Sequence, residues 1–229
     1  MVGLYPAQSD GDDIVIYEDR TAKKVLARMP MLRQQARKSV DRPNLCLADY
    51  LAPVESGIVD TVGLFAVTAG HGIEAHIKRF VAEHDDYSAI LLKALADRLA
   101  EAMAEAVHAR VRRELWLRGR RGAGQRGAHR RALPGHPSAP GYPACPDHTT
   151  KRVLFELLGA TSRAGMQLTD GLAMLPAASV SGLYFGHPRS RYFGLGRIER
   201  DQVADWAVRN GVDLESAERT LGATLAYDA

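Results

Sequence analysis

The residues best equipped for chemistry lie in one short proline-rich stretch, 139–151. It carries Tyr142, Cys145, Asp147 and His148, which offer a phenol, a thiol, a carboxylate and an imidazole. Three prolines interrupt the stretch, and each fixes φ and removes a backbone donor, so we expect a rigid, irregular loop. Binding residues are often found on such loops. The alternative is a purely structural turn that leads into a helix expected over 149–158.

A second stretch, 178–194, contains glycines and paired aromatic residues. Residues 179–185 predict a strand, and 191–197 predict a second strand after a turn through Gly186-His-Pro188, so the pair is compatible with a hairpin. Tyr192 and Phe193 lie in the second strand. Judged by local pattern alone, they are two strand residues of which one faces the core.

The two thiols offer neither a disulfide framework nor a zinc site. Cys46 and Cys145 lie far apart, without a Cys/His cluster, and we interpret them as free cytosolic thiols. The first residues lack the pattern of a signal peptide, and the longest apolar run, 62–69, is too short to span a bilayer. We therefore expect a cytoplasmic protein with no membrane partner.

The remaining chain predicts alternating strands and helices around these stretches. Helix formers dominate 73–113, which we expect to break at 84–87 with Asp85 or Asp86 capping the second helix. Along that second helix, leucine and other apolar residues recur at helical spacing from Leu91 to Val111. Further strands are predicted over 14–17, 23–29, 44–53 and 60–69, a helical turn or two over 32–38, and helices over 151–158, 201–209 and 213–220.

Four basic residues near the predicted turns of 32–38 are interpreted as a solvated face. They are Arg28, Arg33, Arg37 and Lys38.

Many motifs, taken in order, are similar to one family. The loop Ala139-Pro-Gly-Tyr-Pro-Ala-Cys-Pro-Asp-His-Thr149 and the stretch Ser179-Val-Ser-Gly-Leu-Tyr-Phe-Gly-His-Pro-Arg-Ser-Arg-Tyr-Phe-Gly194 resemble the C-terminal activation domain of cobalamin-dependent methionine synthase. The likeness extends over nearly the whole chain, through 3–7, 11–17, 32–35, 44–50, 63–70, 84–87, 93–101, 200–203 and 225–228.

This resemblance implies a fold, a ligand and partners. The fold would be α+β, with a mixed, largely antiparallel sheet flanked by helices, in one domain over 1–229. The domain would bind S-adenosylmethionine and support reductive methylation of cob(II)alamin in methionine biosynthesis. The cobalamin would be held by a separate module of the methyltransferase, and flavodoxin or a similar reductase would supply an electron.

The resemblance also implies site residues. Tyr192 and Phe193 would hold S-adenosylmethionine, and Glu101 would face its sulfonium, which a carboxylate attracts. The loop beside the ligand and the corrin would comprise Gly141, Tyr142, Pro143, Ala144 and Cys145, with His148 near it.

Residues 117–138 depart from the family. They are rich in arginine and glycine, without acidic or β-branched residues. With suitable codons, a neighbouring reading frame yields the family's expected segment, so we interpret 117–138 as the product of two compensating frameshifts. The family's ligand-contacting glutamate and arginine in this segment are then missing. We expect the segment to be disordered, since it has no apolar face to offset the entropy of ordering.

Three functional interpretations remain open at this stage. The family has a further segment before the point that matches Met1, which predicts a domain that is incomplete at its N-terminus. The chain would then be a reactivation module, incomplete as an enzyme alone, or an inactive, degenerate fragment. The third interpretation, nucleic-acid binding through the arginine-rich segment, is disfavoured by the frameshift hypothesis, so we expect no nucleic-acid partner.

Overall fold

The computed structural model describes residues 1–113 and 138–228. The prediction of disorder for 117–138 therefore lies outside the described residues, apart from Ser138. By their contacts, the residues divide into two compact units. Of the described residues, unit 1 comprises 1–3, 64–113 and 154–182, and unit 2 comprises 4–63, 138–153 and 183–228.

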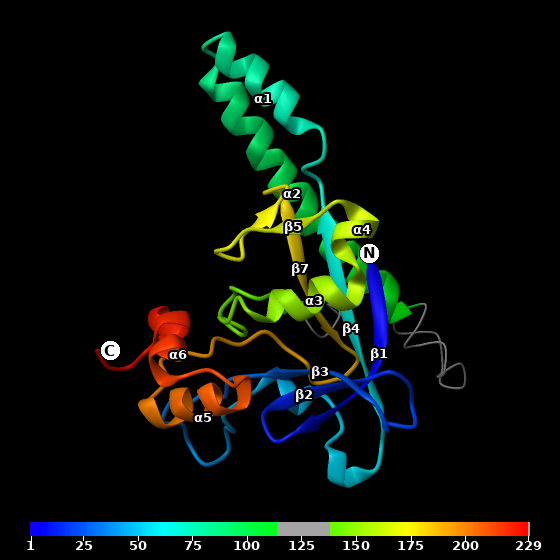
Figure 1. Ribbon diagram of the computed structural model, residues 1–229, viewed down its shortest axis with the longest axis vertical. Coiled ribbons are helices and arrows are strands. Elements are labelled where there is room, and N and C mark those ends of the chain that lie inside the picture. The colour runs from blue at the N-terminus through cyan, green and yellow to red at the C-terminus, as the bar shows by residue number, and fades with distance from the viewer. Residues whose placement is uncertain (114–137, 229) are drawn as a thin grey trace. The chain divides into compact units, whose positions relative to one another are not determined.

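The strands form a five-stranded sheet and a small two-stranded one (Figure 1). The order of the large sheet is β3-β2-β1-β4-β7, and that of the small sheet is β5-β6. The strands are β1 (Val2–Asp10), β2 (Asp13–Tyr17), β3 (Val25–Pro30), β4 (Asp60–Thr68), β5 (Gln167–Leu168), β6 (Met174–Leu175) and β7 (Ser179–Phe185). β1, β4 and β7 contribute residues to both units.

The helices complete an α+β fold, as the resemblance implied. They are α1 (Ile73–Ala82), α2 (Asp86–Val111), α3 (Thr150–Leu158), α4 (Ala160–Ala164), α5 (Arg200–Asn210) and α6 (Leu214–Leu221). Short 3-10 helices lie at Leu47–Tyr50, Val54–Ser56 and Gly222–Thr224. No helix among the described residues combines the length and apolarity needed to cross a membrane.

In unit 2, the antiparallel meander β1-β2-β3 is built around the fully buried strand β2. Apolar residues at 14–16 account for that burial, and the first residue of the strand, Asp13, is buried as well. Its carboxylate pairs with Arg209 of α5 at 2.6 Å and with Arg28 of β3 at 3.1 Å. A buried carboxylate needs such partners, so these ion pairs fix α5 against the meander.

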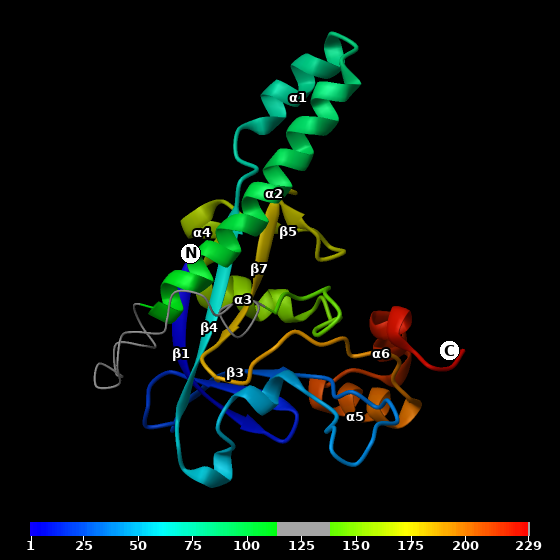
Figure 2. The ribbon, with the colours of Figure 1, turned by 180° about the vertical axis from the view of Figure 1, so that it is seen from behind.

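A second apolar cluster in unit 2 packs α5 and α6 together. Trp206 and Val203 of α5 and Leu221 of α6 meet Leu195 and Ile198, which precede α5. α5 and α6 lie side by side in both views (Figures 1 and 2). The helix predictions for 201–209 and 213–220 are confirmed, and the Asp213 carboxylate accepts from Ser216 N–H at 2.8 Å as the cap of α6.

In unit 1, α1 and α2 lie alongside each other (Figures 1 and 2). The predicted break is confirmed, since Asp85 caps α2 and accepts from Ser88 N–H at 2.9 Å. The apolar stripe along α2, however, is not its buried face. Leu91, Leu95, Leu99 and Met103 are exposed, whereas the buried residues of α2 are Ala89, Ala96, Ala100, Ala104, His108 and Val111.

The helical turns predicted over 32–38 are wrong. Here Arg33 bridges to Cys46 as in an antiparallel strand. The side-chain amide of Gln202 accepts from Arg33 N–H at 2.6 Å and donates to Arg33 C=O at 2.9 Å. Gln34 N–H donates to Leu45 C=O at 3.0 Å. These distant partners satisfy the backbone groups that a helix would have paired locally.

The interpretation of the basic residues as a solvated face is wrong for the partly buried Arg33, whereas Arg28 is exposed. Arg33 pairs with Asp12 and Asp49, each at 2.6 Å, which raises its pKa. Arg28 pairs with Asp10 at 2.6 Å as well as with Asp13. Arg37 and Lys38 are exposed.

Most of the strand predicted over 44–53 is also wrong, because residues Leu47–Tyr50 form a 3-10 helix. Asp49 determines this local structure. Its carboxylate accepts from Cys46 N–H at 2.8 Å, three residues earlier, and also binds Arg33.

Candidate functional site

The proline-rich loop folds back upon itself at Gly141. Gly141 N–H donates to Cys145 C=O at 2.7 Å, and Cys145 N–H donates to Tyr142 C=O at 2.9 Å. Ala144 and Cys145 are buried, whereas Tyr142 is 45% exposed. The loop thus presents a phenol to solvent from a rigid backbone, as its prolines predicted.

Gly141 has no room for a side chain. Its φ of +92° is one that L residues rarely adopt, and a Cβ there would lie 2.4 Å from His148 Cε1. The imidazole of His148 therefore packs directly against the Gly141 backbone. The glycine and the histidine are both predicted site residues, and they pack against each other within the loop.

His148 is held in turn by the start of α3. Nζ of the buried Lys151 lies 2.8 Å from His148 Nδ1, and the Asp147 carboxylate accepts from Thr149 N–H at 2.7 Å. Burial and the Lys151 charge lower the pKa of His148, while Asp147 opposes them; burial lowers the pKa of Lys151. A neutral His148 with Nδ1 as acceptor and the proton on Nε2 fits this arrangement.

The second stretch meets the loop within the same unit. Leu195 N–H donates to Pro143 C=O at 2.8 Å. The Tyr192 phenol is 45% exposed, and burial together with interaction with the Tyr142 phenol raises its pKa. Both tyrosine rings remain accessible to solvent.

The strand predicted over 191–197 is wrong, because no strand forms in this segment. Its backbone groups form hydrogen bonds with residues from different parts of the sequence. Tyr50 Oη donates to Arg191 C=O at 3.1 Å, the side-chain amide of Gln34 donates to Gly194 C=O, and Leu195 binds Pro143. An irregular segment held at so many points can present successive side chains in different directions.

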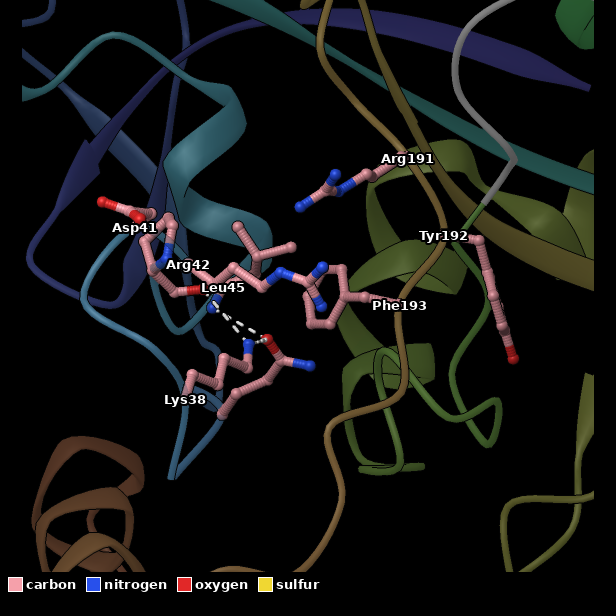
Figure 3. Close-up of a pocket in the computed structure, with 9 residues that line it drawn as sticks. Lys38, Asp41, Arg42, Leu45, Arg191, Tyr192 and Phe193 are labelled. Atoms are coloured by element: carbon pink, nitrogen blue, oxygen red, sulfur yellow. Dashed lines mark hydrogen bonds between the residues drawn. The ribbon is translucent and has the colours of Figure 1, made fainter. Parts of the chain in front are cut away.

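Phe193 and Tyr192 point to opposite sides of this segment (Figure 3). Phe193 is only 7% exposed, and its ring centroid lies 6.5 Å from that of Tyr50. One member of the aromatic pair is thus anchored and the other faces outward beside Tyr142.

Comparison with known proteins shows the family of the chain. Residues 1–211 match the sequence model of the family described as "Vitamin B12 dependent methionine synthase, activation domain". The chain belongs to this family. A crystal structure of the MetH reactivation domain bound to AdoHcy is similar, with 47% sequence identity and a TM-score of 0.90. The match covers 99% of this chain and 70% of that chain.

Glu101 of this activation domain lies in unit 1, on α2, whereas the other predicted site residues lie in unit 2. Its carboxylate pairs with Arg98 at 2.6 Å, and the Glu101 side chain is 44% exposed. The carboxylate is therefore accessible to solvent. Its role toward a ligand stays a prediction.

Cys145 serves the activation domain as a packing residue. Burial, with a smaller contribution from Asp147, raises the pKa of its thiol to about 12, and burial raises that of Cys46 to about 12 as well. Both thiols are thus protonated at neutral pH and unsuited to nucleophilic chemistry. Both are also free, as predicted. Within 1–113 and 138–228, no group of three His, Cys, Asp or Glu side chains could hold a metal ion.

Sequence reasoning missed three residues that build the site. Tyr50 supports Phe193 and Arg191, Gln34 binds Gly194, and Lys151 holds His148. Tyr50 and Gln34 lie more than a hundred residues from their partners, so no local pattern links them. Lys151 lies three residues after His148, one helical turn away, and that spacing was the available signal.

Proposed function

We propose that this domain binds S-adenosylmethionine with the loop 141–145, His148 and the pair Tyr192-Phe193, all of which lie in unit 2. The Pro143–Leu195 hydrogen bond carries the proposal, because it joins the two motifs into one surface. The similar reactivation domain was crystallised with AdoHcy, which is S-adenosylmethionine without its transferable methyl group.

The residues fit a sulfonium ligand. The Tyr142 and Tyr192 rings are accessible, and aromatic faces attract cations. The Gly141 turn lets backbone come close to a ligand, and its rigidity lowers the entropic cost of binding.

In the complete enzyme, this domain would support reductive methylation of cob(II)alamin held by the cobalamin-binding module. S-adenosylmethionine supplies a methyl cation equivalent, leaving S-adenosylhomocysteine, and a reductase such as flavodoxin supplies one electron. The residues of this chain bind and orient the methyl donor. Their contribution is positioning, which removes much of the entropic barrier between two reactants.

Calorimetry with S-adenosylmethionine tests this proposal. We expect saturable binding that Tyr192→Ala weakens, because the substitution removes an exposed ring beside Tyr142. Tyr87→Ala is the matched control, since Tyr87 is an exposed tyrosine at the start of α2, outside the proposed site. No binding by the unaltered chain would favour the interpretation as a degenerate fragment. Equal affinity of the Tyr192→Ala variant would exclude the proposed location.

A further inference from the structure

A hollow of about 690 Å³ lies beside the segment 191–193 of unit 2. Its walls come from 34–45 and 191–193 (Figure 3). Phe193 points toward Arg42 and Leu45 in this view, whereas Tyr192 lies on the other side of the backbone. We call this the basic hollow, because Lys38, Arg42 and Arg191 line it.

The charges of the basic hollow are not balanced. Three cations line it against one carboxylate, that of Asp41. The Lys38 ammonium donates to Gln34 Oε1 and, at 3.1 Å, to Pro43 C=O, and both acceptors are neutral. Among the described residues, none of these three cations forms an ion pair, although Arg28, Arg33 and Arg209 of the same unit all do. Unbalanced charge in a concave site raises the local concentration of counter-ions.

The framework of the basic hollow is held by side chains from both walls. Gln34 bonds to Leu45 through backbone and side chain, both at 3.0 Å, and to Gly194 through its side-chain amide. Tyr50 Oη binds Arg191 C=O, and the Tyr50 ring packs near Phe193. The two ends of the wall 34–45 and the backbone of Arg191 are therefore fixed, which lowers the cost of binding.

We propose that the basic hollow binds a small phosphate-bearing molecule, with Arg42, Arg191 and Lys38 as the anion-binding residues. Arginine and lysine are the usual phosphate ligands in proteins, and charged hydrogen bonds to phosphate are strong. The apolar wall at Leu45 and Phe193 leaves room for an organic part of the ligand. Docking of an acidic protein is the less favoured occupant, because stable interfaces need a surface of ~1,000 Å² or more rather than one hollow.

The proposal does not require S-adenosylmethionine binding. Arg42, Arg191 and Lys38 do not belong to the methyl-donor site proposed above, although Tyr192 and Phe193 line the basic hollow as well. Failure of one proposal can thus be distinguished from failure of the other.

The test is an NMR titration of the 229-residue chain with inorganic phosphate at low ionic strength, with chloride at equal ionic strength as reference. We expect saturable shifts of backbone amides in 34–45 and 190–194. Arg42→Gln and Lys38→Gln should each weaken binding about tenfold, since each removes a charged hydrogen bond. Arg37→Gln is the matched control, because Arg37 is an exposed cation of the same segment that does not line the hollow.

The outcomes separate the alternatives. Saturable phosphate shifts that Arg42→Gln and Lys38→Gln weaken and Arg37→Gln leaves within twofold support the proposal. Equal shifts with phosphate and chloride, or equal weakening by all three variants, overturn it, because they indicate only a general charge effect. Tight binding of an aspartate-rich peptide without saturable phosphate binding would also overturn it, in favour of a protein-docking surface.

Discussion

The amide of Leu195 donates to the carbonyl of Pro143 at 2.8 Å, across some fifty residues of sequence. This bond ties the irregular segment of Tyr192 to the loop of Tyr142, and both phenols remain accessible. The candidate site thus depends on two turns whose backbones are fixed to one another. The following predictions test the contacts on which that arrangement depends.

Substitution of Gly141 should disrupt the loop. Gly141→Ala is expected to cost about 1–2 kcal/mol from its φ alone, and more from the clash with His148. Gly11→Ala is the control, because Gly11 also has a positive φ but nothing lies near its Cβ position. Urea unfolding should show a larger loss for Gly141→Ala, with part of it recovered in a Gly141→Ala/His148→Ala double variant. Equal losses at both glycines would contradict the packing described here.

Stability should fall in mild acid because of His148. Its pKa is lowered in the folded state, so the unfolded chain binds the proton more readily. The stability that neutral His148 contributes is present above its unfolded pKa of 6.5 and is lost as pH falls through the folded value. Urea unfolding between pH 8 and 5 should therefore show a decline that His148→Gln reduces. His76→Gln, a change at an exposed residue of α1, should leave the decline unaltered.

Substitutions in the leucine stripe of α2 should change stability little, whereas substitutions in its alanine face should destabilise the fold. Leu99→Gln is expected to change the free energy of unfolding by less than about 0.5 kcal/mol, because Leu99 is exposed. Ala100→Leu should destabilise by about 1–3 kcal/mol, since Ala100 is completely buried and extra volume in a close-packed interior forces its neighbours to move. Chemical denaturation measures both, and a reversed order would mean that the stripe is the packed face after all.

The ion pair between Asp13 and Arg209 should be costly to break. Arg209→Met leaves a buried carboxylate with only Arg28, and a loss of about 3 kcal/mol is expected. Arg219→Met is the control, because its pair with Glu215 is exposed and worth little. The Asp13→Asn/Arg209→Met double variant should recover much of the loss. A loss no greater than that of Arg219→Met would show that the buried pair does not hold α5.

The sequence predicted regular elements well where local pattern determines them. β7 matches its predicted bounds, and the break before α2 lies at the expected cap, Asp85. The failures share one physical cause, since at 32–38 and 191–197 the backbone is satisfied by distant partners such as Gln202 and Pro143. Such pairings follow from the fold and leave no local signal. The helical spacing from Leu91 to Val111 correctly predicted α2, but it gave no sign that the buried face of the helix is mostly alanine.

The site residues came from motif resemblance rather than from spacing. Local chemistry identified the loop of Tyr142 and His148 as a place for binding, but it could not link that loop to Tyr192. Nor could it anticipate that Cys145 is buried and protonated. The sequence also gave no sign that Tyr50 and Gln34 bind the backbone of the segment 191–194, because both come from distant parts of unit 2.

Hydrogen–deuterium exchange with and without S-adenosylmethionine tests the central claim most directly. A single site built from both motifs predicts that the ligand slows amide exchange in 139–151 and in 190–196 together, at the same ligand concentration. Protection of one segment without the other, or of neither, would contradict the claim that the two motifs form one binding surface.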